Sequence, residues 1–264
     1  LPRLFRPWCV VLLMVSALGA PAPAAAQGAP AVAAASDLKF ALDEIAAMYL
    51  KQTGQPVRIS YGSSGNFMRQ IQQDAPFELF LSADEAFVFQ LADQGRTVDR
   101  GTLYATGRIV LFAPKASAWQ PDARLAGLRA ALAEGRITRF AIANPEHAPY
   151  GRAAREALQA AGLWEAMQRH LVLGENVSQA AQFAVSGSAQ GGIFAYSLVL
   201  APSFANAGRY MLVPEHMHQP LRQRMVLTRK AGAAARAFHA FLQQPAARGV
   251  FQRYGFVLPG TAPN

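Results

Sequence analysis

From residue 31 onward the chain alternates short apolar runs with longer amphipathic runs, and this alternation limits the possible folds more than any other feature. The first apolar run, 31–35, is followed by apolar side chains at helical spacing up to Gly54. Strands are expected at 31–35, 56–61 and 78–81, and helices at 37–53, 66–74 and 84–92. Alternating strands and helices predict a mostly parallel sheet flanked by helices.

The same alternation begins again after a strongly apolar strand at 108–114. Further strands are expected at 139–143, 170–173, 192–195 and 209–213, and further helices at 125–134, 151–161, 176–185, 231–242 and 246–254. We interpret the apolar run 223–228 as a return crossing. The sequence therefore predicts an α/β protein of two lobes joined by two crossover segments, with a ligand cleft between them. Residues 28–108 and 229–264 would form lobe 1, and 109–228 lobe 2 with the crossovers.

The first 27 residues have a different composition from the rest. Arg3 and Arg6 precede an apolar run at 9–15, and small residues follow up to Gln27. This pattern is typical of a secretory signal peptide, and the run is shorter than the ~20 residues that span a bilayer. We therefore predict cleavage and a periplasmic location. Cleavage would also remove Cys9, the single cysteine, so the mature domain would need no disulfides.

The chain is strongly basic, with a formal net charge of +9 and a pI near 10.2. A nucleic-acid partner is not expected, because the basic residues are dispersed and no basic strip is interleaved with aromatic residues. The charge instead favours a mild field that attracts small anions.

Two serines stand where a predicted strand gives way to a helix. Ser36 follows the first strand and Ser64 the second. Serine at such a position commonly caps the helix, and capping alone would explain either residue. The first-turn N–H groups of a helix also bind anions, and the turns at 144–151 and 174–177 have the same form. Four helix N-termini meeting in the cleft would make an oxyanion site without a buried cation.

Six segments, in this order along the chain, resemble the periplasmic molybdate-binding components of ABC importers. They are Ala-Ala-Ala-Ser-Asp-Leu at 33–38, Gly-Ser-Ser-Gly at 62–65, Ala-Pro-Phe-Glu-Leu-Phe-Leu-Ser-Ala-Asp at 75–84, Asn-Pro-Glu-His-Ala-Pro-Tyr-Gly at 144–151, Glu-Asn-Val at 175–177 and Phe-Gln-Arg-Tyr-Gly-Phe at 251–256. The resemblance covers essentially all of the chain after the signal peptide. It implies a two-lobe periplasmic binding protein that closes over molybdate, and also tungstate, and delivers the anion to a permease in the inner membrane. A monomer without catalytic residues or a cofactor is expected.

The resemblance also implies which residues contact the anion. Ser36 and Ser64 would donate from lobe 1, and Tyr150 and the N–H of Val177 from lobe 2. Asp37 would present only its backbone N–H, because its carboxylate repels an anion. Some members of the family place a tyrosine where this chain has Ala195 followed by Tyr196, and we expect Tyr150 to supply the phenol instead.

Three alternatives remain open from the sequence. The protein could bind another small oxyanion, or it could be a docking protein without a small ligand. An exported serine hydrolase is disfavoured, because no serine lies in a G-x-S-x-G turn with an ordered Asp and His. His147 is a lone histidine in a proline-flanked loop, and we interpret it as structural or exposed rather than catalytic.

Overall fold

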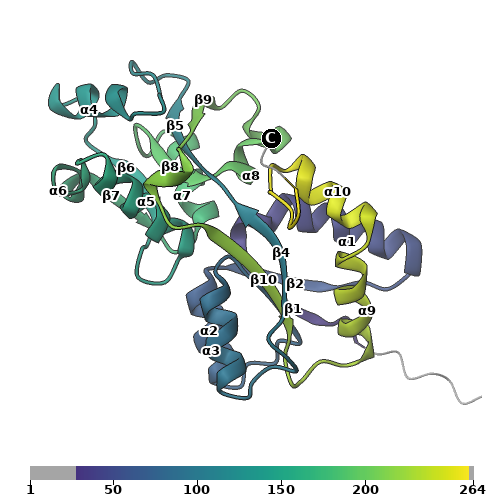
Figure 1. Ribbon diagram of the computed structural model, residues 1–264. Coiled ribbons are helices and arrows are strands. Elements are labelled where there is room, and N and C mark those ends of the chain that lie inside the picture. Colours follow the sequence, from purple (N-terminus) through teal and green to yellow (C-terminus); the bar gives the residue numbers. More distant parts are fainter. Residues whose placement is uncertain (1–27, 262–264) are drawn as a thin grey trace, which may run out of the picture.

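The protein contains two five-stranded sheets, one in each lobe, in a computed structural model that describes residues 28–261 (Figure 1). The first sheet has the order β2-β1-β3-β10-β4 and the second β7-β6-β8-β5-β9. The strands are β1 Ala31–Ala35, β2 Arg58–Gly62, β3 Leu79–Ser82, β4 Thr102–Gly107, β5 Ile109–Pro114, β6 Phe140–Ala143, β7 Leu171–Gly174, β8 Gly192–Ala195, β9 Gly208–Leu212 and β10 Leu221–Leu227.

Helices cover both faces of each sheet, as the alternating pattern predicts. In lobe 1, α1, α9 and α10 pack on one face, and α2 and α3 on the other (Figure 1). The α-helices are α1 Lys39–Thr53, α2 Ser64–Gln72, α3 Glu85–Asp93, α4 Ala126–Ala133, α5 Pro149–Ala160, α6 Trp164–Met167, α7 Val177–Val185, α8 Tyr196–Val199, α9 Ala233–Leu242 and α10 Pro245–Arg253. Short 3-10 helices are η1 Ser36–Leu38, η2 Gln168–His170, η3 Pro202–Phe204 and η4 Glu215–Met217.

The predicted α/β fold with two sheets is confirmed, and each sheet is mixed in the same way. β2, β1 and β3 pair in parallel, whereas β10 runs antiparallel to β3 and β4. In lobe 2, β5 takes the corresponding place between β8 and β9. One strand in each sheet therefore opposes the other four. Strands β1 and β6 lie inside their sheets and are buried along their whole length, which explains their continuous apolar sequence.

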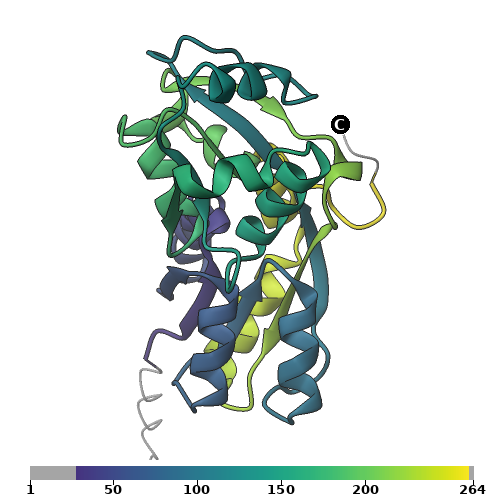
Figure 2. The same cartoon turned by 90° about the vertical axis from the view of Figure 1, so that its left-hand side faces the viewer.

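The lobes are connected where β4 leads directly into β5, with Arg108 between the two strands. Figure 2 shows the lobes one above the other, with the long strand β4–β5 running from one into the other. The second connection, by which the chain returns from lobe 2 to lobe 1, differs from the prediction. Residues 223–228, interpreted as a crossing segment of lobe 2, belong largely to β10 of the first sheet, so the return falls between β9 and β10. An apolar strand gives the same sequence signal whichever sheet it joins. The predicted signal peptide lies outside the described residues.

Candidate functional site

A small cavity of about 10 Å³ lies where the two lobes meet, and we call it the interlobe cavity. It is lined by Ala35, Ser36, Asp37, Gly62, Ser63, Ser64, Ala83, Ala148, Pro149, Tyr150 and Val177. The structure therefore brings together all five residues singled out from the sequence, from segments up to 141 positions apart.

The topology explains why these residues meet. Ser36 directly follows β1, and Ser64 begins α2 after β2. In the other lobe, Pro149 begins α5 after β6, and Val177 begins α7 after β7. The carboxyl ends of parallel strands lie at one edge of a sheet, so the helices that follow them present their N-termini there. Two such edges face each other across the cavity, which places first-turn N–H groups on both sides.

Both serine hydroxyls are held in position by a backbone N–H group. The N–H of Ser178 donates to Ser36 Oγ at 3.2 Å, and the N–H of Ala83 donates to Ser64 Oγ at 2.9 Å. In the described part of the chain neither hydroxyl proton has an acceptor. A serine hydroxyl has one proton to donate. Each of these protons is therefore available to an anion in the cavity.

Tyr150 and Asp37 belong to a buried hydrogen-bonded network beside the cavity. The Tyr150 hydroxyl donates to Asp37 Oδ2 at 2.9 Å. The Gln223 amide donates to the same carboxylate oxygen at 2.7 Å and to the Tyr150 hydroxyl at 2.9 Å. The Tyr104 hydroxyl donates to Gln223 Oε1 at 2.7 Å. Gln223 and Tyr104 lie on β10 and β4, far from Asp37 in the sequence, and no local pattern marked them.

Asp37 is the one acidic group in this network, and its side chain is buried. Burial raises the pKa of its carboxyl from 3.8 to about 6, although hydrogen bonds from Gln223 and Tyr150 and the backbone N–H groups of Asp37 and Leu38 oppose this rise. Among the described residues, no donor lies in hydrogen-bonding geometry with its second oxygen, Oδ1. Burial and the neighbouring Asp37 also raise the pKa of Tyr150 well above its usual value, so the phenol stays protonated. The sequence predicted that Asp37 takes part in the site only through its backbone N–H. In the structure its carboxylate also accepts the hydrogen bond that fixes the Tyr150 hydroxyl.

His147 connects the lobes beside the cavity. Its carbonyl oxygen accepts from the N–H of Gly65 at 2.9 Å, and its Nδ1 lies 2.9 Å from Ser63 Oγ. The structural interpretation of His147 fits these contacts, although its Nε2 does have a carboxylate neighbour, Glu175, at 3.6 Å. That neighbour was missed because it lies on the separate turn before α7.

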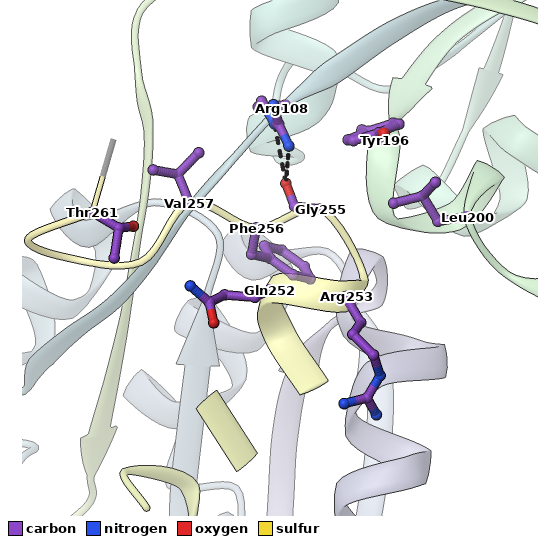
Figure 3. Close-up of a pocket in the computed structure, with 9 residues that line it drawn as sticks. All are labelled: Arg108, Tyr196, Leu200, Gln252, Arg253, Gly255, Phe256, Val257 and Thr261. Carbon is purple, nitrogen blue, oxygen red and sulfur yellow. Dashed lines mark hydrogen bonds between the residues drawn. The ribbon is translucent and has the colours of Figure 1, made fainter. Parts of the chain in front are cut away.

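Tyr196 lies elsewhere, in a larger cavity of about 420 Å³ next to the connection between β4 and β5. Figure 3 shows Arg108 pointing at the Gly255 carbonyl oxygen, with Tyr196 beside it. The guanidinium donates to that oxygen at 2.9 and 3.0 Å, and its carbon lies 4.9 Å from the centre of the Tyr196 ring. Tyr150, and not Tyr196, lines the cavity that holds the two serines.

The described residues contain no cluster of three or more His, Cys, Asp or Glu side chains able to hold a metal ion. Within 28–261, no helix combines the length and apolar character needed to cross a membrane.

Two α/β lobes that meet around a small cavity lined by hydroxyls and helix N-termini define a two-lobed solute-binding protein. The chain belongs to the bacterial extracellular solute-binding proteins, whose family model matches residues 30–257.

Relatives of known name agree with this assignment. The chain is 35% identical to a molybdate-binding protein of Rhodobacter capsulatus over 259 residues, 97% of this chain and 98% of the relative. It is 37% identical to the one of Azotobacter vinelandii over 250 residues, 93% and 97% of the two chains. The solved structure of the periplasmic molybdate-binding protein of Azotobacter vinelandii superposes with a TM-score of 0.80 at 31% identity, covering 87% of this chain and 99% of that structure. The resemblance inferred from the six sequence segments is confirmed.

Proposed function

We propose that the protein binds molybdate, and also tungstate, in the interlobe cavity and delivers it to an ABC permease in the inner membrane. The observation that carries this proposal is the pair of buried serine hydroxyls, Ser36 and Ser64, whose protons face one cavity without an acceptor in the described chain. The names of the relatives supply the identity of the anion.

The site suits a small dianion held through its oxygens. The hydroxyls of Ser36 and Ser64 from lobe 1 line the cavity, and α2 and α7 begin there, so the dipoles of these helices favour negative charge. No residue in this arrangement coordinates the metal atom directly. Molybdate and tungstate have nearly the same size and shape, so one cavity would hold both. Sulfate is smaller and would leave some of these donors unpaired.

The remaining parts of the proposal follow from this role. The protein would act in the periplasm as a monomer, without catalysis and without a cofactor, because its task is to enclose the anion and release it to the permease. The proposed contacts to the oxygens of the anion come from Ser36, Ser64, Tyr150, the N–H of Val177 and the backbone N–H of Asp37. Another small oxyanion is the second candidate, since hydroxyl and N–H donors recognise the oxygens rather than the central atom.

Thermal unfolding with molybdate, tungstate, sulfate and phosphate in parallel tests the ligand. At a thousandfold excess over Kd, a ligand bound only by the native state adds about 4 kcal/mol of stability. For a chain of this size that corresponds to a rise in Tm of about 10 °C. We expect this rise with molybdate and tungstate and little change with sulfate or phosphate. An equal rise with sulfate would favour the second candidate, and no rise with any anion would contradict both.

Ser64→Ala tests the place of binding. The variant loses one hydrogen bond to a charged ligand, worth about 1.5–3 kcal/mol, so Kd for molybdate should rise by about 10- to 100-fold. Calorimetric titration measures this change. The exposed Ser203 on η3 provides the matched control, because Ser203→Ala removes the same kind of hydroxyl from a residue that does not line the cavity. Unchanged affinity in Ser64→Ala would place the site elsewhere.

A further inference from the structure

The single proton of the Tyr150 hydroxyl has two competing uses. In the structure it is donated to Asp37 Oδ2 at 2.9 Å, while the Tyr150 oxygen accepts from Gln223. A phenol donates one hydrogen bond. As long as Asp37 is an anion that holds this proton, Tyr150 cannot donate to an oxyanion in the cavity. A neutral Asp37 has a proton of its own, and the Tyr150 proton is then free to turn to the ligand.

The surroundings of Asp37 provide no positive charge to balance its carboxylate. The titratable groups that face it are phenols, Tyr150 from α5 and Tyr104 from β4, with the neutral Gln223 from β10. From α7, Ser178 bonds to the neighbouring Ser36, and from α8 the Ser197 hydroxyl donates to the Asp37 carbonyl oxygen at 2.7 Å. No cationic side chain is among the described contacts of the carboxylate. The backbone N–H groups of Asp37 and Leu38 also favour the charged form, but Oδ1 is buried and, among the described residues, no donor meets hydrogen-bond geometry with it.

We propose that the interlobe cavity binds its oxyanion only when Asp37 is protonated, so that each anion bound takes up one proton from the solvent. The inference rests on the proposed function, since it concerns the same cavity. The proton adds to the Asp37 carboxylate and nothing leaves the protein. Protonation removes the negative charge beside the arriving dianion and frees Tyr150 to donate to it.

Affinity should then depend on pH in a definite direction. In the empty protein burial places the pKa of Asp37 near 6, and an adjacent dianion raises it further. Above that value the carboxyl must be protonated for binding, and the affinity falls as pH rises. For one obligatory proton, Kd should rise about 50-fold between pH 6 and pH 8. Molybdate itself stays fully deprotonated over this range, so the ligand does not cause the change.

Calorimetric titration of the mature protein with sodium molybdate tests this directly. Measured at pH 7.5 in two buffers of different ionisation enthalpy, the heats give the number of protons exchanged. We expect uptake of about one proton per anion. In Asp37→Asn, which keeps the size of the side chain but cannot titrate, uptake should fall to about zero and Kd should become nearly independent of pH. Asp93→Asn, an exposed aspartate of α3 paired with Arg100, is the control and should behave as the wild type.

The outcomes separate this inference from the proposed function. Tight molybdate binding by the wild type without proton uptake, and with a flat pH profile, would overturn the role of Asp37 and leave the proposed function intact. No binding at any pH, including pH 5.5, would instead remove the proposed function. If Asp37→Asn does not fold, the wild-type comparison between the two buffers still decides the question.

Discussion

Gly65→Ala should weaken molybdate binding by about 10- to 100-fold while the protein stays folded. Gly65 lies in the first turn of α2 in lobe 1, and its N–H donates across the interlobe cavity to the His147 carbonyl oxygen at 2.9 Å. A Cβ at this position would stand 2.7 Å from that oxygen and 3.1 Å from the His147 Cα. Backbone atoms cannot turn away, so the lobes must move apart, at a cost of about 1–3 kcal/mol in the closed state.

The free energy of unfolding of the unliganded Gly65→Ala protein should rise or stay unchanged, although its affinity for molybdate falls. Gly65 is helical and does not have a positive φ, so alanine improves helix propensity by up to about 1 kcal/mol once the lobes open. Gly249→Ala in α10 is the matched control, because its Cβ meets nothing within 4 Å. It should give the same gain in helix stability with unchanged Kd. Calorimetric titration and urea unfolding measure the two quantities, and wild-type affinity in Gly65→Ala would show that closure does not need this contact.

Without ligand, the wild type should lose stability relative to Asp37→Asn as pH rises from about 4 to 6. The pKa of Asp37 is 3.8 in an ordinary environment and about 6 in the folded protein, because burial disfavours the charged form. Between these values the folded state binds more protons than the unfolded state, so the free energy of unfolding falls with pH and then levels off. The full difference corresponds to about 3 kcal/mol.

Urea unfolding of both proteins at several pH values measures this effect. The difference between the two curves isolates Asp37, since every other titratable group is shared. A difference that stays constant from pH 4 to pH 7 would mean that burial does not raise the pKa of Asp37. A wild type that gains stability relative to Asp37→Asn as pH rises would mean that the fold stabilises the charged carboxylate. Either result would also weaken the case for proton-coupled binding.

The elements of the fold are largely contained in the sequence, because burial imposes a local pattern. β1 is apolar along its length since both of its faces are covered, and α1 repeats apolar residues at helical spacing and ends at Gly54, whose φ is +70°. β4 was not predicted. Its sequence, Thr-Leu-Tyr-Ala-Thr-Gly, is only partly buried and has no clear alternation. The partners of a strand depend on distant residues, which is why β10 was recognised as an apolar run but not as a strand of the first sheet.

The candidate site divides in the same way. Ser36, Ser64, Tyr150 and Val177 stand where a strand turns into a helix, a position that leaves a signal in a few neighbouring residues, and the sequence alone singled them out. The tertiary structure alone decided how the Tyr150 proton is used and how deeply Asp37 is buried. It also decided the contacts of Gln223, Tyr104 and Gly65. A side chain's partner, its desolvation and the room around it depend on residues as much as 186 positions away, here Gln223 from Asp37, and no pattern within a single segment can record them.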